Sequence, residues 1–217
     1  MTDRDAFLAV KTRLNRDVGG LIELIDKEPT FVPFWALIRA LFPIAESISD
    51  LLYFRESDDV RKSQEFLIKL LRERFGKINP GYTQYAGVLV VMYRHSLTHQ
   101  DVLRAILYQD AHIAVAWAVS FHAHGKKHVE MEMVGGKYED LTTGNQGQTA
   151  HLFFDLRQFY LDLDSVLDVL LKEDFGGKVG KRYQEWLTYR LGNSKSDQEA
   201  RKDIDAMPKV TQLLPLS

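Results

Sequence analysis

The chain of 217 residues contains no cysteine. This absence excludes disulfide bonds, thiolate–metal sites and cysteine nucleophiles. Net charge is also nearly missing, at −2 for pH 7, which argues against a protein that coats nucleic acid by bulk electrostatics. Contact with RNA or DNA would therefore require a local basic patch.

Long hydrophobic runs are missing as well. The apolar stretches are interrupted, as by Arg39, Pro43 and Glu46, or are too short to cross a bilayer. The first five residues (MTDRD) are charged and do not resemble the apolar core of a signal peptide. We therefore expect a cytoplasmic protein.

What is present is an ordinary globular composition, because 45% of residues are hydrophobic and 27% are charged. Apolar residues recur at spacings of three and four, which is typical of amphipathic helices. This spacing predicts helices over about 3–27, 32–54, 57–75 and 82–97. The second is apolar around most of its circumference, which indicates a central helix, and Pro43 should kink it.

Beyond these helices the apolar period changes from about 3.6 to 2, which indicates strands. In residues 115–123, apolar side chains at odd positions alternate with alanine, serine or histidine at even positions, and the alternation resumes after Gly125 over 129–133. The sequence predicts an antiparallel β-hairpin at about 114–134 with a three-residue loop. The expected pairs are His124 with His128, His122 with Glu130, and Phe121 with Met131.

A loop over 135–149 should follow, then a helix over 150–173 and a shorter one over 179–191. The expected fold class is mainly α: a helical bundle with a small antiparallel β-hairpin inserted between the fourth helix and the last long helix. We expect one domain over residues 1–192 and a mobile C-terminal tail over 193–217.

The sharpest chemical feature is Arg94-His95-Ser96-Leu97-Thr98-His99, at the C-terminal end of the fourth predicted helix. Arg94 and His99 are about 140° apart on an ideal helix. They converge only if the helix loosens near Ser96–Thr98, or if a second copy of the segment faces the first. The alternative is structural, because cations near a helix C-terminus interact favourably with the helix dipole.

This segment resembles the signature of HEPN domains, which is an arginine, a polar residue, three further residues and a histidine. HEPN domains are helical bundles with the motif near the end or start of a core helix, and many are metal-independent ribonucleases. The order of helices over about 3–173 is also similar, and the strand insertion before a last long helix resembles bacterial members.

The resemblance implies that Arg94 and His99 form a catalytic pair that cleaves RNA without a cofactor. His99 would act as acid or base, since imidazole titrates near neutral pH, and Arg94 would bind the phosphorane oxygens. His95, as the polar second residue, would orient the pair or contact phosphate, and Thr98 is a further supporting candidate. The resemblance also implies a homodimer that brings two motifs together, and it leaves open a protein partner of the antitoxin type.

Glu46, on the second predicted helix, could support Arg94 or His99. With Arg39 and Asp50 it forms one polar stripe at spacings of seven and four. The alternative is that this stripe makes structural ion pairs within the bundle.

Two other functions remain open. The protein could be a non-catalytic helical interaction or nucleotide-binding module, in which the motif is a structural cap or a ligand contact. It could also bind a metal ion through His122, His124 and His128 together with Glu130 and Glu132. The alternative for these histidines is a solvated strand face. The sequence shows no glycine-rich phosphate loop and no Gly-x-Ser-x-Gly elbow.

Overall fold

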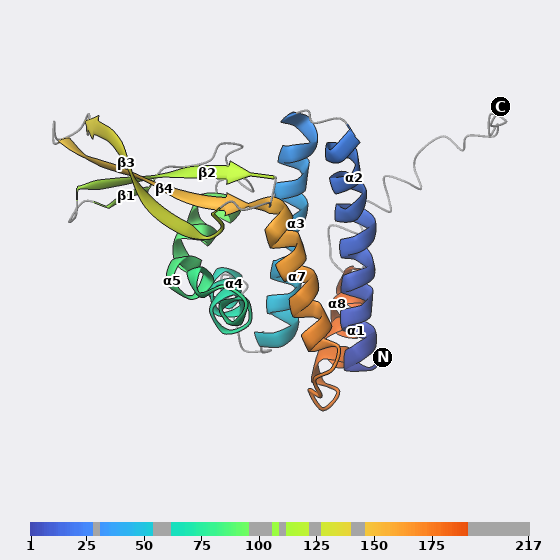
Figure 1. Ribbon diagram of the computed structural model, residues 1–217. Coiled ribbons are helices and arrows are strands. Elements are labelled where there is room, and N and C mark those ends of the chain that lie inside the picture. The colour runs from blue at the N-terminus through green and yellow to red at the C-terminus, as the bar shows by residue number, and fades with distance from the viewer. Residues whose placement is uncertain are drawn as a thin grey trace, which may run out of the picture.

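The computed structural model describes residues 1–27, 31–53, 62–95, 106–108, 112–121, 127–139 and 146–190. Within these ranges the chain is mainly helical and forms a four-stranded mixed sheet (Figure 1). The predicted tail over 193–217 lies outside the described residues. Among the helices that are described, none combines the length and the hydropathy needed to cross a membrane.

The N-terminal helical rod consists of α1 (Asp3–Arg13), a π-helical turn η1 (Leu14–Gly19) and α2 (Gly20–Lys27). Thr2 caps the rod, because its hydroxyl accepts the N–H of Asp5 at 3.1 Å and the Asp5 carboxylate accepts the N–H of Thr2 at 2.9 Å. This reciprocal arrangement satisfies two backbone donors that would otherwise lack partners. The rod confirms the helix predicted over 3–27.

Helix α3 spans Phe31–Tyr53, within one residue of the prediction at each end. Pro43 lies inside the helix, and the Ser47 hydroxyl donates to its carbonyl at 2.8 Å. Buried side chains occupy most of the circumference of α3, as expected for a central helix: Leu37, Ile38, Leu41, Phe42, Ile44, Ala45, Ile48 and Leu51.

The next helices are α4 (Ser63–Glu73) and α5 (Pro80–Leu89), with a 3₁₀ turn η3 (Phe75–Lys77) between them. Helix α5 continues as a second π-helical turn, η4 (Val90–His95). These elements confirm the third and fourth predicted helices, except for the ends that fall in 54–61 and 96–97, outside the described residues.

The sheet consists of β1 (Ile106–Tyr108), β2 (Ile113–Ser120), β3 (Glu130–Glu139) and β4 (Gln146–Asp155). The strand order is β1-β2-β4-β3, with β2 parallel to β4 and the other pairs antiparallel. Figure 1 shows the sheet extending away from the N-terminal helical rod and α3, with α4 and α5 below the sheet.

The predicted hairpin is therefore wrong in its pairing. Strand β4 lies between β2 and β3, so Met131 pairs with Leu152 and not with Phe121, and Glu130 pairs with Phe153. The physical reason is burial. Strand β4 buries Ala150, Leu152 and Phe154 and so takes the central position, whereas β3 carries exposed Glu130 and Glu132 and lies at the edge. His122 and His124, the other members of the expected pairs, lie outside the described residues.

The helix predicted to begin at residue 150 begins at Leu156, because the residues before it form β4. Helix α7 (Leu156–Leu170) starts with Asp155 as its N-cap, whose Oδ1 accepts the N–H of Gln158 at 2.9 Å. Helix α8 (Lys178–Arg190) follows. The predicted loop over 135–149 is also corrected, since β3 and β4 cover both of its ends.

The sheet and helices meet at a cluster of aromatic rings. Phe159 of α7 contacts Phe42, Phe75, Tyr82 and Phe154 with ring centroids between 5.1 and 6.2 Å apart. These rings come from α3, η3, α5 and β4, so one side chain joins four elements. The cluster fixes how α5 lies against the sheet.

Candidate functional site

The motif segment begins at the end of the α5–η4 helix. Asn79 caps this helix, since its Oδ1 accepts the N–H of Gly81 at 2.8 Å, and Pro80 occupies the first turn, where a missing N–H costs nothing. One side of the helix is buried along its whole length: Tyr82, Ala86, Leu89, Val90, Met92 and Tyr93. The motif therefore starts from a core helix.

Tyr93 fixes the backbone immediately before Arg94. Its ring stacks on Phe154 at 4.8 Å and on Phe42 at 6.3 Å, and its hydroxyl donates to the Leu152 carbonyl at 3.3 Å. Burial raises the pKa of Tyr93 far above its ordinary value, so the hydroxyl remains a donor. The contacts of Tyr93 with α3 and β4 therefore fix the backbone position of the next residue, Arg94.

Of the predicted site residues, Arg94 and His95 lie at the end of η4, and the structure describes their backbone only. Thr98 and His99 lie outside the described residues. A π-helical turn leaves one residue extra in the helix and is frequent at functional sites. The turn η1 is also π-helical, so this feature does not distinguish the motif from the rest of the molecule.

Glu46 lies on α3, one turn after Phe42, and is half-buried. Its Oε1 accepts the hydroxyl of Ser63 at 3.4 Å, and Glu46 has a further interaction besides this one. Because Phe42 stacks on Tyr93, Glu46 is one helical turn away from the contact between α3 and η4. Support of Arg94 or His99 by Glu46 stays a prediction.

A second polar site lies wholly within the described residues, and it was not expected from the sequence. It centres on Tyr82, which is completely buried. The Tyr82 hydroxyl lies 2.7 Å from Nε2 of His128 and 2.9 Å from Oδ2 of Asp162. His128 is 6% exposed and Asp162 is 2% exposed, so three polar groups from α5, the segment before β3, and α7 meet in the interior.

The tautomer of His128 follows from the hydrogen bond at Nδ1. Nδ1 accepts the backbone N–H of Asp155 at 3.0 Å, so it carries no proton. The neutral ring must then hold its proton on Nε2 and donate it to Tyr82. Tyr82 in turn donates to Asp162. Burial, and then the nearby charge of Asp162, raise the pKa of Tyr82 well above its ordinary value and keep it a donor.

Three further contacts hold this network to the surrounding elements. The Gln158 amide donates to Oδ1 of Asp162 at 2.8 Å, and the Asn79 amide donates to the His128 carbonyl at 2.9 Å. The Ser120 hydroxyl donates to the carboxylate of Asp155 at 2.5 Å. We call Tyr82, His128, Asp162, Gln158 and Asn79 the buried polar network.

This network corrects the expectation that His128 shares a solvated strand face with Glu130 and Glu132. Both His128 nitrogens are hydrogen-bonded inside the protein and the residue is buried, so the ring is not part of a solvated strand face. In the part of the chain that the structure describes, no group of three or more side chains is arranged to hold a metal ion. A signal for the network was present, because Asp162 interrupts the apolar stripe of α7 between Phe159 and Val166.

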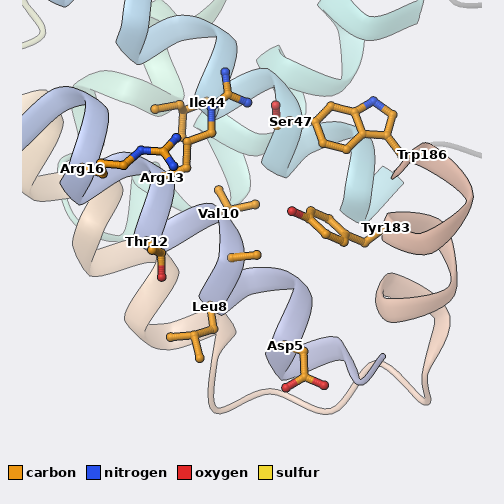
Figure 2. Close-up of a pocket in the computed structure, with 11 residues that line it drawn as sticks. Asp5, Leu8, Val10, Thr12, Arg13, Arg16, Ile44, Ser47, Tyr183 and Trp186 are labelled. Carbon is orange, nitrogen blue, oxygen red and sulfur yellow. The ribbon is translucent and has the colours of Figure 1, made fainter. Parts of the chain in front are cut away.

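An open groove of about 530 Å³ runs between α1, α3 and α8. Figure 2 shows Tyr183 and Trp186 on one wall and Arg13 and Arg16 on another. Both arginines pair with Asp17, which neutralises part of the basic rim. The remaining lining is largely apolar: Leu8, Ala9, Val10 and Ile44, with Thr12, Ser47 and Asp5 at its margins.

Comparison with known proteins gives no match. Neither a family model, nor a curated protein, nor a solved structure is similar to the chain at a significant level.

Proposed function

We propose that this protein is a HEPN-like, metal-independent endoribonuclease in which Arg94 and His99 act at one shared site in a homodimer. The observation that carries the proposal is that Arg94 and His95, the first two residues of the motif, lie at the end of a buried core helix in a mainly helical protein. The packing of Tyr93 against α3 and β4 supports it, because a catalytic group needs a rigid structural support.

The proposed chemistry is transfer of a phosphoryl group within the RNA chain. The ribose 2′-oxygen attacks the neighbouring phosphorus, the bond from phosphorus to the 5′-oxygen breaks, and a 2′,3′-cyclic phosphate and a 5′-hydroxyl form. His99 takes the 2′-hydroxyl proton or supplies the proton that the leaving oxygen needs. Arg94 binds the charged phosphorane oxygens. Two motifs across a dimer supply both an acid and a base, and they remove the difficulty that Arg94 and His99 start about 140° apart on one helix.

The direct test is cleavage of a labelled single-stranded RNA in the presence of EDTA. Wild-type protein should cleave it, and Arg94→Ala or His99→Ala should lower the rate by at least about 100-fold. This is the usual contribution of a positioned acid–base group, as proposed for His99, and of a donor that stabilises transition-state charge, as proposed for Arg94. His95→Ala should reduce the rate less, since His95 is a supporting residue.

Matched control variants separate loss of chemistry from general damage. His112→Asn removes an exposed histidine whose φ of 49° asparagine tolerates, and Arg72→Ala removes an exposed arginine of α4. Both should cleave as the wild type does. Cleavage that survives Arg94→Ala and His99→Ala would contradict the proposal.

The alternative is a non-catalytic helical interaction or nucleotide-binding module. The observation that favours it is that several basic side chains of the described residues are paired with carboxylates, which neutralises part of the positive surface that RNA would need: Lys11 with Asp164 and Asp168, Arg74 with Glu173, Lys127 with Glu132, and Arg157 with Asp26. No RNA cleavage by a folded wild-type protein would favour this alternative.

A further inference from the structure

The buried polar network opens onto a pocket at the N-terminal end of α5. The pocket has a volume of about 310 Å³, at the small end of the range of about 300–1,000 Å³ for ligand sites. His128 and Asp162 are its most buried lining residues, while Ile78, Pro80 and Glu130 are exposed at its rim. Pro80 and Arg94 are about 20 Å apart along the helix axis, so this pocket is separate from the motif.

Asp162 brings a buried negative charge to the pocket. Both carboxylate oxygens accept hydrogen bonds, from Tyr82 and from Gln158, as those of an ionised carboxylate do. His128 is 3.4 Å away, but its Nδ1 accepts a backbone N–H, so the ring is neutral. Within the described ranges Asp162 forms no ion pair with lysine or arginine. A buried charge without a counter-ion is costly, so a cation in the pocket would stabilise the site.

The other lining groups offer acceptors. The Gln158 amide nitrogen is used by Asp162, which leaves Oε1 without a donor among the described residues. The Glu130 carboxylate likewise has no ion-pair partner there. The donor groups that line or underlie the pocket each make a hydrogen bond inside the protein: Asn79 with the His128 carbonyl, His128 with Tyr82, and Tyr82 with Asp162. A ligand that complements this set carries positive charge and several N–H donors.

We propose that this pocket binds the ammonium or guanidinium group of a small organic cation, with Asp162 as the charged partner at its floor and Glu130 as a second carboxylate at its rim. Gln158 orients Asp162 through its amide and adds an acceptor. Each N–H···carboxylate bond is charge-assisted and made away from bulk water, where such bonds are strong. The proposal does not depend on RNA cleavage.

The test is a titration of ¹⁵N-labelled full-length protein, followed by NMR, with n-butylammonium or ethylguanidinium chloride. At least one of the two should saturate and shift the amide signals of Val129, Glu130 and Gln158. Butan-1-ol, which lacks the charge, and tetramethylammonium, which lacks N–H donors, should not. Equal binding of either control would overturn the proposal, and so would saturable binding of Mg²⁺ without binding of the two cations.

Variants locate the binding. Asp162→Asn should weaken it by at least about tenfold, since a hydrogen bond to a charged group is lost, and Glu130→Gln should weaken it less. Glu132→Gln is the matched control, because Glu132 lies on the same strand but pairs with Lys127, and it should bind as the wild type does. If Asp162→Asn does not fold, Glu130→Gln and Gln158→Ala carry the test. Unchanged affinity in the folded variants, or no saturable shift in the wild type, would overturn the proposal.

Discussion

Among single residues, Asp3 shows how one side chain joins distant parts of the chain. Its carboxylate accepts three backbone N–H groups at the start of α8, from Phe175 at 3.2 Å and from Gly177 and Gly180 at 2.8 Å. Burial alone would raise the pKa of Asp3. The hydrogen bonds from Gly180, Gly177 and Phe175 outweigh burial and lower the pKa below its ordinary value.

We expect Asp3→Asn to lower the free energy of unfolding by about 1–3 kcal/mol at pH 7, because an amide presents N–H groups to backbone donors. A folded pKa below the unfolded value of about 3.9 means that this contribution is present above pH 4 and is lost as pH falls through the folded pKa. Urea unfolding of wild type and variant at several pH values should therefore show a difference that shrinks in acid.

Glu23→Gln is a suitable control for Asp3→Asn, because Glu23 is exposed on α2. It should change the unfolding free energy by less than about 0.5 kcal/mol. A pH-independent difference between Asp3→Asn and the wild type would contradict the account of Asp3.

Among the elements, α5 matters most, because it carries the cation pocket at one end and the start of the motif at the other. Its N-terminal turn lies directly against the backbone before β3. A Cβ atom at Gly81 would be 2.0 Å from the Val129 carbonyl oxygen, whereas nothing lies within 4 Å of a Cβ at Gly87.

Substitution of the two glycines by alanine should therefore have opposite effects on the free energy of unfolding, although both lie in one helix. Gly81→Ala should lower the free energy of unfolding by about 1–3 kcal/mol through overpacking. Gly87→Ala should raise it by about 0.5–1 kcal/mol, since alanine loses less backbone entropy in a helix. Denaturant unfolding of the two variants checks both signs. Equal effects of the two changes would show that α5 does not pack on Val129 as described.

Strand β4 shows why part of the fold was not predictable. The run Leu152-Phe153-Phe154 continues into Leu156, Phe159 and Leu163, so its apolar residues fit a helical period as well as a strand. Helices such as α3 were predicted to within one residue, because local spacing determines them. The parallel pairing of β2 with β4 joins residues that are 35 positions apart in the sequence, which local periodicity does not encode.

The buried polar network was missed for a related reason. Alternation along the strand placed His128 with Glu130 and Glu132, but His128 precedes β3, and its ring turns into the core toward Tyr82 and Asp162. Only Asp162, a charged residue inside an apolar helical stripe, pointed to a buried polar site. Its partners come from segments far apart in sequence, and the fold alone brings them together.

At the scale of the whole molecule, the proposed site is formed by two chains. Arg94 and His99 would be about 140° apart on an ideal helix, and in the proposed homodimer a second copy of the motif supplies the missing partner. Light scattering coupled to size-exclusion chromatography should give twice the chain mass of 25.0 kDa, and RNA cleavage per chain should fall on dilution below the dimer dissociation constant. A monomer that cleaves at an unchanged rate would contradict the dimeric site.

The central claim is that the protein cleaves RNA through the ribose 2′-hydroxyl without a metal ion. The most direct measurement uses two short single-stranded RNAs in EDTA, identical except for one 2′-deoxyribose at the mapped cleavage position. We expect a 2′,3′-cyclic phosphate product from the all-ribose RNA and no cut at that position in the RNA with the deoxyribose. The His99→Ala variant should cleave neither RNA. Cleavage next to the deoxyribose, or none of either RNA by a folded dimer, would contradict it.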